Sequence, residues 1–247
     1  MKNNIARKPF YWLFLLLFLP FPAGAQSASQ DSAYEREAYA AAIHTYHRYL
    51  RPENGLYNGG EYADYTASLT QGYPYFGPNE SQPGWIVYNG MRYDSLELWY
   101  DLVTDAVVLK DPDNILKIQL INERLRSFSL GGHLFLRVQR DSINDLKTGF
   151  YELLCAGRVN LYKKPDKNLQ TYATQDGLQK IIYSDSSYYI ERADHFLPVN
   201  RKSSILKALA DKKPAVRSYI RKNRLSIRKN KEEALLKIVT YYNGLAL

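Results

Sequence analysis

Four carboxylates gather in one short stretch of the chain: Asp94, Glu97, Asp101 and Asp105. Two opposed carboxylates about 5–10 Å apart can act as acid and base on a glycosidic bond, which makes Asp94, Asp101 and Asp105 the catalytic candidates. Aromatic residues that would suit a sugar-binding surface are nearby in the sequence: Tyr73, Tyr75, Phe76, Trp85 and Trp99. Turn formation and polar alternation on a solvated strand face explain the same carboxylates without a reaction, and we favour that interpretation.

His44 and His47 are the candidate metal ligands. They are three residues apart in a segment that we expect to be helical, so they would share one side of the helix. Paired histidines can bind zinc when a third ligand completes the site, and His133, His195 or Glu37 could serve. The pair lacks the adjacent glutamate of the zinc-protease helix motif. Ordinary surface histidines are the simpler interpretation, and we expect neither a metal nor a cofactor.

Other signatures of catalysis are missing from the sequence. It contains no G-x-S-x-G, no P-loop and no G-x-G-x-x-G turn. Cys155 is the single cysteine, which excludes an intrachain disulfide framework. It ends the mostly apolar stretch 150–155, where cysteine behaves as a small buried hydrophobe, and nothing local would activate it as a nucleophile. A non-catalytic protein is therefore favoured over an enzyme.

Residues 1–25 have the layout of a secretory signal peptide. Lys2, Arg7 and Lys8 precede a short apolar run, residues 10–21, and the small residues 23–25 form a cleavage site. We therefore expect the mature chain to begin at Gln26 and to be exported, which argues against nucleic acid as a partner. After residue 25 no apolar run approaches the ~20 residues of a membrane-spanning helix, so we expect no transmembrane segment in the mature chain.

Charge is divided unevenly along the 247 residues. The whole chain has a net charge of +8, and loss of the three basic residues of the signal leaves +5. Residues 26–200 carry a net charge of −5, whereas residues 201–247 carry +10. The candidate partner-binding residues lie in this basic end: Arg217, Arg221, Lys222, Arg224 and Arg228. They could bind an anionic surface or an acidic protein, or they could simply form a solvated outer face.

Hydrophobic periodicity predicts the elements that carry these residues. Residues 31–50 favour a helix, and residues 54–83 are rich in Gly and Pro and predict loops with one or two short strands. Residues 85–199 show alternating runs separated by turns, as in an antiparallel sheet. The predicted hairpins turn at Asn89-Gly90, Thr104-Asp105 and Gly131-Gly132. The last predicted strands are 158–162, 180–183 and 188–192.

The C-terminal 45 residues change to helical periodicity. Ser203 is the expected N-cap of a first helix, Pro214 suits the first turn of a second, and Asn230 with Glu233 resembles a capping box for a third. The third helix would place its apolar residues on one face: Leu235, Ile238, Val239 and Tyr242. Each helix has a stripe to bury, so we expect these helices to dock rather than form a free tail.

Two blocks of sequence are similar to a known group of proteins. One runs through residues 84–94 (GWIVYNGMRYD) and 98–108 (LWYDLVTDAVV), and the other through residues 202–243 with its core YIRKNRL at 219–225. Together they resemble a family of exported, uncharacterised proteins of Bacteroidota. The resemblance covers about half of the mature chain and carries no catalytic residue with it. It implies a location in the envelope of a Gram-negative cell, in the periplasm, at the outer membrane or secreted.

The expected fold class is α+β. An N-terminal helix and a large antiparallel sheet (a meander, sandwich or partly open barrel) would span residues 26–200, and a basic helical subdomain docked on it would span residues 201–247. The expected function is a non-catalytic binding or scaffold module of the cell envelope. The alternative is an enzyme that acts on envelope glycans through the carboxylates of 94–105. A cleft holding two of them would favour the enzyme, and a continuous sheet with these residues dispersed would favour the binding module.

Overall fold

A computed structural model describes Ala38, Tyr39, Ala41, Ala42 and residues 55–110, 116–139, 146–175 and 177–245. The signal peptide expected at 1–25 and most of the helix expected at 31–50 lie outside the described residues, and both stay predictions. The described part of residues 54–83 contains short 3-10 turns and one short strand, as its composition predicts.

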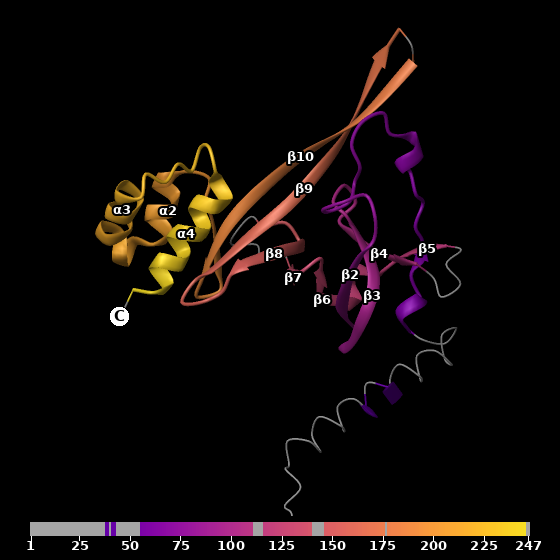
Figure 1. The fold of residues 1–247 in the computed structure, drawn as a ribbon, viewed down its shortest axis with the longest axis horizontal. Helices are drawn as coiled ribbons and strands as arrows, with labels where there is room; N and C mark the ends of the chain where they lie inside the picture. Colours follow the sequence, from indigo (N-terminus) through magenta and orange to yellow (C-terminus); the bar gives the residue numbers. More distant parts are fainter. Residues whose placement is uncertain are drawn as a thin grey trace, which may run out of the picture. The chain divides into compact units, whose positions relative to one another are not determined.

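Within the described residues, eleven strands form one antiparallel sheet (Figure 1). They are β1 (Gly60–Glu61), β2 (Gln82–Tyr88), β3 (Met91–Asp101), β4 (Ala106–Lys110), β5 (Lys117–Gln119), β6 (Leu125–Leu130), β7 (His133–Val138), β8 (Gly149–Cys155), β9 (Asn160–Thr174), β10 (Gly177–Arg192) and β11 (His195–Pro198). Their order is β1-β5-β4-β3-β2-β6-β7-β8-β9-β10-β11. The large antiparallel sheet is thus confirmed, and it is a single open sheet rather than a sandwich or a partly open barrel.

The predicted hairpins form where glycine and asparagine permit positive φ. Asn89 and Gly90 have φ of 51° and 79° and join β2 to β3, while Gly131 and Gly132 have φ of 56° and 86° and join β6 to β7. Positive φ at both central residues defines the turn whose twist matches that of the flanking strands. Asp105 at φ 54° closes the β3–β4 hairpin in the predicted place.

The hairpin of β9 and β10 is far longer than the sequence predicts. We expected strands at 158–162, 180–183 and 188–192, but the pairing is continuous from Asn160 opposite Glu191 to Thr174 opposite Gly177. The strand that we expected to end at residue 162 continues through 163–167, which contains Pro165 and several charges that usually interrupt a strand. Here the lysines of that stretch bond to neighbouring elements, Lys164 to Asp105 and Lys167 to the carbonyl oxygens of Tyr73 and Tyr75, so the strand continues.

Aromatic rings fill the core of strands β2 to β8. Tyr100, Phe128, Phe135 and Phe150 are fully buried and make mostly edge-to-face contacts, and Phe128 stacks on Phe135 with 4.7 Å between ring centroids. Such arrangements are the favourable ones for aromatic quadrupoles. We call these four rings and their aliphatic neighbours the aromatic core.

Three α-helices follow the sheet: α2 (Lys202–Ala208), α3 (Lys213–Lys222) and α4 (Lys231–Asn243). The predicted apolar face of α4 is confirmed, because Leu235, Ile238, Val239 and Tyr242 are all fully buried. They share one cluster with Leu161 of β9 and Ile190 of β10, which we call the helical core. The C-terminal helices are therefore docked on the end of the sheet that β9 and β10 form.

The expected helix caps need two corrections. Helix α2 begins at Lys202 with Arg201 as N-cap, not Ser203, because Ser204 Oγ accepts from the Arg201 amide and donates to the Arg201 carbonyl oxygen. Asn230 is the N-cap of α4, but it makes no side-chain capping bond; its Nδ2 donates instead to Glu233 Oε2 at 3.3 Å. Pro214 lies in the first turn of α3, as predicted, and Gly244 follows the last residue of α4.

Candidate functional site

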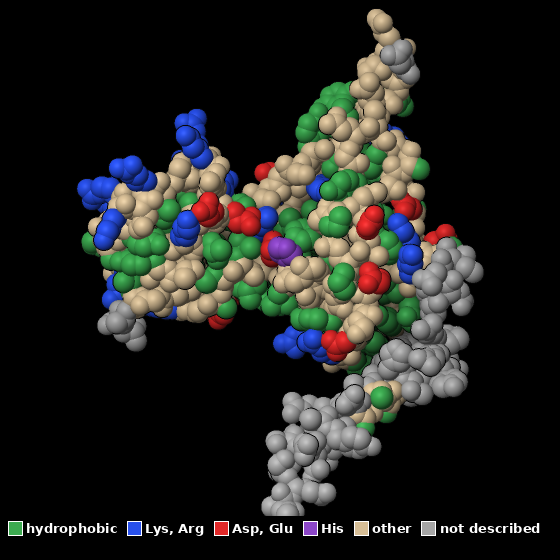
Figure 2. All heavy atoms as spheres, in the orientation of Figure 1, with side chains coloured by type: hydrophobic (Ala, Val, Ile, Leu, Met, Phe, Trp, Pro, Cys, Tyr) green, Lys and Arg blue, Asp and Glu red, His purple; other side chains and the backbone are tan. Residues whose placement is uncertain are grey.

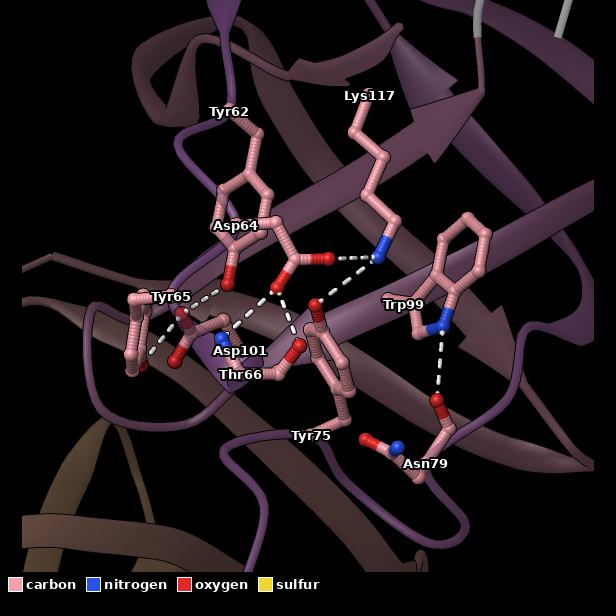
Figure 3. Close-up of polar contacts among 9 residues, drawn as sticks. All are labelled: Tyr62, Asp64, Tyr65, Thr66, Tyr75, Asn79, Trp99, Asp101 and Lys117. Carbon is pink, nitrogen blue, oxygen red and sulfur yellow. Dashed lines mark hydrogen bonds and ion pairs between the residues drawn. The ribbon is translucent and has the colours of Figure 1, made fainter. Parts of the chain in front are cut away.

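Asp101 is a fully buried carboxylate at the end of β3 (Figure 3). Its Oδ2 accepts from the hydroxyls of Tyr62 and Tyr65 at 2.8 and 3.0 Å. Its Oδ1 accepts from the amides of Val103 and Thr104 at 2.8 and 3.1 Å, within the turn that follows the strand. Burial, followed by the bond to Asp101, holds the pKa of Tyr62 far above its ordinary value. The four donors satisfy the carboxylate, which fixes the loop of residues 62–65 on the sheet.

The other carboxylates of the hairpin have separate partners. Asp94 is exposed and pairs with Arg92 at 2.8 Å, and Glu97 is exposed as well. Asp105 lies in a different environment from Asp101: it accepts from Tyr100 Oη at 2.5 Å and pairs with Lys164 at 2.6 Å. Tyr100 and Asp101 are neighbours on β3, so they point to opposite faces of the sheet. The candidate carboxylates are thus dispersed over a continuous sheet rather than opposed in a cleft.

Two of the aromatic residues that suggested a sugar-binding surface are buried around a lysine. Lys117 Nζ pairs with Asp64 at 2.5 Å, donates to Tyr75 Oη at 3.2 Å and lies 4.6 Å from the centroid of the Trp99 ring (Figure 3). Burial works against ionisation of Asp64, but the bonds from Lys117 and Thr66 outweigh it and hold its pKa below the ordinary value. Tyr75 and Trp99 are only 1% and 6% exposed, so they offer no free face to a sugar.

The remaining aromatic candidates also have partners. The Arg92 guanidinium lies 4.1 Å from the centroid of the Trp85 ring, and Lys167 Nζ lies 4.4 Å from that of Tyr73. Phe76 packs edge-on against His133 and Phe135. These contacts are intramolecular cation–π and aromatic pairs, which stabilise the surface on which they lie.

A polar row that the sequence did not indicate crosses the sheet between the aromatic core and the helical core. Glu152 of β8 is 3% exposed; its Oε1 lies 2.5 Å from His133 Nδ1, and its Oε2 lies 3.9 Å from Lys163 Nζ. Lys163 also pairs with Glu232 of α4 at 2.6 Å, and Glu232 accepts from Tyr188 Oη. Burial acts to raise the pKa of Glu232, but the bonds from Lys163 and Tyr188 outweigh it and lower that pKa.

This row joins α4 to the sheet by charge as well as by packing. Sequence reasoning missed it because Glu152, Lys163 and Glu232 come from three distant segments with no shared motif. The strand register was the only possible signal, since Glu152 stands opposite Lys163 in the β8–β9 pairing. Within the described part of the chain, the imidazole of His133 contacts Glu152 and the Phe76 ring, and neither is the hydroxyl or thiol nucleophile that acyl-transfer chemistry would need.

The remaining histidine and cysteine predictions have simple outcomes. His44 and His47 lie outside the described residues, and His195 is exposed on β11. Among the residues that the structure describes, no group of three His, Cys, Asp or Glu side chains is placed to hold a metal ion. Cys155 is half-buried rather than buried: its Sγ lies 3.8 Å from Thr240 Oγ1 and from Asn243 Nδ2. It packs against the edge of the helical core.

The basic candidates lie on α3 and in the segment between α3 and α4. Arg217, Arg221, Lys222, Arg224 and Arg228 are all exposed, and across the described ranges none of them forms an ion pair. Figure 2 shows Lys and Arg side chains over this helical end of the chain. The apolar residues Val216 and Ile220 of α3 are buried in the helical core. We call these five exposed cations the basic patch.

The acidic residues Asp211 and Glu233 of the helical end form ion pairs with cations outside the basic patch. Asp211 pairs with Arg158 and Arg192 at 2.9 Å each and accepts from Tyr242 Oη at 3.0 Å, and Glu233 pairs with Lys237 at 2.6 Å. These carboxylates therefore bind cations outside the basic patch and leave its charge uncompensated.

No family model matches the chain, and neither a curated protein nor a solved structure is significantly similar to it. Within the described ranges, no helix has the length and apolarity required to cross a membrane.

Proposed function

We propose that this protein is a non-catalytic binding module, exported to the cell envelope, that attaches to an anionic envelope surface through the basic patch. One observation carries the proposal: the helices bury their apolar stripes in the helical core, while α3 and the segment between α3 and α4 present five exposed cations without ion-pair partners. A docked layer holds its charges in fixed positions, as a surface-binding module requires.

The spacing of the basic patch supports the same function. Arg217 and Arg221 are one helical turn apart on α3, and Arg224, with φ 50°, comes one residue after the C-cap Asn223. Each basic residue close to an anionic surface contributes about 1 kcal/mol at moderate salt. Five such residues would contribute about 5 kcal/mol, and the attraction falls off beyond a screening length of about 8 Å at physiological ionic strength. Binding should therefore be reversible and sensitive to salt.

The export signal expected at 1–25 and the resemblance of the 84–108 and 202–243 blocks support the envelope location within this proposal. The dispersed carboxylates of 94–105 support a binding module over an enzyme. Glycosidases need two carboxyl groups directed at one bond, and here Asp101 and Asp105 have their own partners on opposite faces.

Vesicle co-sedimentation tests the proposal. The chain from Gln26 to Leu247 is mixed with vesicles of phosphatidylglycerol and phosphatidylcholine, or of phosphatidylcholine alone, at 50 and 500 mM salt. We expect binding only to anionic vesicles, and its loss at high salt. No binding to anionic vesicles at 50 mM salt would remove this function.

A matched pair of double variants locates the contact. Arg217→Glu with Arg221→Glu should reduce binding at least tenfold. Arg124→Glu with Arg126→Glu changes the net charge equally at two exposed positions outside α2, α3 and α4, and should leave binding within about twofold. Equal losses from both pairs would indicate a response to net charge alone and would contradict a role of the basic patch.

A further inference from the structure

The outer part of the β9–β10 hairpin, from residue 168 to the turn, has one protected edge and one open edge. On the β10 edge, the amides of Lys180 and Ile182 point away from β9, to Thr70 Oγ1 and the Gln71 carbonyl oxygen at 3.1 and 3.0 Å. The segment that contains Thr70 and Gln71 therefore covers the β10 edge around Ile181.

The backbone register identifies the groups of the open edge. Lys180 stands opposite Thr171, and Ile182 opposite Leu169. In an antiparallel ladder, the amide and carbonyl groups of two opposed residues either both point toward the partner strand or both point away from it. Leu169, Thr171 and Ala173 therefore direct their amide and carbonyl groups away from β10. Pairing with β8 ends at Lys163, and the last backbone contact on this side joins the Lys167 amide to the Leu102 carbonyl oxygen. From Asn168 to Thr174, no backbone group of the described residues hydrogen-bonds to this side of β9.

Protective residues are present only on the covered part of the strand. Proteins guard exposed strand edges with charges, prolines or bulges. Residues 163–167 (KKPDK) carry four charges and a proline, whereas residues 168–174 (NLQTYAT) carry no charge and no proline. The outer part of the β9–β10 hairpin, which we call the arm, also holds four of the nine large hydrophobic side chains that are exposed in the described residues: Leu169, Tyr172, Leu178 and Tyr183. This edge is thus suited to pair rather than to remain solvated.

We propose that two copies of this chain associate through these open edges, with β9 of one copy antiparallel to β9 of the other about a two-fold axis at Thr171. The outward-pointing residues are symmetric about that position, so Leu169 of each copy would face Ala173 of the other. About six backbone hydrogen bonds would form, two for each opposed pair. The two hairpins would become one four-stranded sheet with isologous contacts.

The chemistry of the edge selects a second copy over a foreign peptide. No like charges meet across the axis, because the segment has none, and no charge is present to select a partner of opposite sign. The contact area of two strand edges is below the ~1,200 Å² of stable complexes, so we expect a dissociation constant in the micromolar to millimolar range. Self-association would place two basic patches on one particle, independently of what those patches bind.

Sedimentation velocity on the chain from Gln26 to Leu247, from about 5 to 500 µM, tests the proposal. We expect the sedimentation coefficient to rise with concentration. Thr171→Asp and Thr171→Lys each place like charges on the axis and should weaken association at least tenfold. An equimolar mixture of these two variants should restore association, because Asp then faces Lys. Only a pairing with position 171 on the axis gives this result.

Gln179→Asp is the matched control. It adds the same charge to the same arm on β10, away from the axis, and should associate like the unmodified chain. Circular dichroism and thermal unfolding confirm that each variant is folded. A monomer at every concentration, equal association of all variants, or a mixture that stays monomeric would each overturn the proposal.

Discussion

Asp101 and Asp105 stand on one β-hairpin, yet their carboxylates serve opposite faces of the sheet. Asp101 accepts from Tyr62 and Tyr65 on one face, and Asp105 binds Tyr100 and Lys164 on the other. Proximity in sequence therefore does not make them a catalytic pair. Each carboxylate instead ties a different segment to the β3–β4 hairpin, and the consequence is measurable as stability.

Replacing Asp101 with Asn should destabilise the fold by about 2–3 kcal/mol. The substitution preserves the side-chain shape but removes a buried charge that accepts four hydrogen bonds, and bonds to charged groups are the stronger ones. Urea unfolding followed by circular dichroism measures the change. Asp94→Asn is the control, because Asp94 forms an exposed pair with Arg92 and its loss should cost less than about 0.5 kcal/mol. Equal effects of the two variants would contradict the structural role of Asp101.

Asp211 should make stability depend on pH in the acidic range. Burial acts to raise its pKa, but the bonds from Tyr242 and Arg192 outweigh it and lower the pKa below the ordinary value. A carboxyl group whose pKa is lower in the folded state contributes stability in full above its unfolded pKa of about 4. That contribution is lost as the pH falls through the folded pKa.

Asp211→Asn tests this dependence. We expect the variant to be less stable than the unmodified chain by about 1 kcal/mol at pH 7, and the difference to shrink as the pH falls below about 4. Urea unfolding at pH 7, 5, 4, 3 and 2 gives the difference directly. A difference that stays constant down to pH 2 would show that the ionised form of Asp211 contributes nothing.

Leu235→Ala should cost about 3 kcal/mol, because Leu235 is fully buried in the helical core and its truncation leaves a cavity. The adjacent Leu236 is 38% exposed, so Leu236→Ala should change stability by less than about 0.5 kcal/mol. Thermal unfolding measures the loss of stability in the two variants, which both replace a leucine with alanine. If Leu236→Ala cost as much stability as Leu235→Ala, α4 would not be docked through the face that carries Leu235 and Ile238.

Gly84→Ala should destabilise the sheet by about 1–3 kcal/mol. A Cβ at Gly84 would overlap the carbonyl oxygen of Ser129 on the neighbouring strand β6, and backbone atoms cannot move aside cheaply. Gly60→Ala is the control, since a Cβ at Gly60 meets no atom within 4 Å. The denaturant midpoint of Gly84→Ala should be lower than that of Gly60→Ala. An unchanged midpoint for Gly84→Ala would contradict the close approach of β2 and β6.

Local chemistry made part of the fold predictable. The Asn89-Gly90 and Gly131-Gly132 turns follow from which residues tolerate positive φ, and the buried face of α4 follows from its 3.6-residue period. The length of the β9–β10 hairpin did not follow, because Pro165 and its charged neighbours have the composition of a break. Their tertiary partners, Asp105 and the carbonyl oxygens of Tyr73 and Tyr75, cannot be read from the hairpin itself.

The candidate sites also include features that the sequence predicts and features that depend on contacts between distant segments. The exposure of Arg217 and Arg221 follows from the helical period, because the apolar residues Val216 and Ile220 of the same helix must face a core. The burial of Asp101 depends on Tyr62 and Tyr65, which lie in an irregular segment far upstream without a period to place them. The contact between His133 and Glu152 depends on the register of two strands, which a one-residue slip would abolish.

The strand order also bears on how the chain reaches this structure. All but two of the neighbouring strand pairs join strands that are consecutive in the chain; the exceptions are β1 with β5 and β2 with β6. Consecutive pairs close short loops, and low contact order is associated with fast folding. We therefore expect the sheet to grow hairpin by hairpin as the chain emerges, with the β2–β6 pairing as the main slow step. Refolding of the Gly84→Ala variant, which alters that pairing, should then be slowed as well as less favourable.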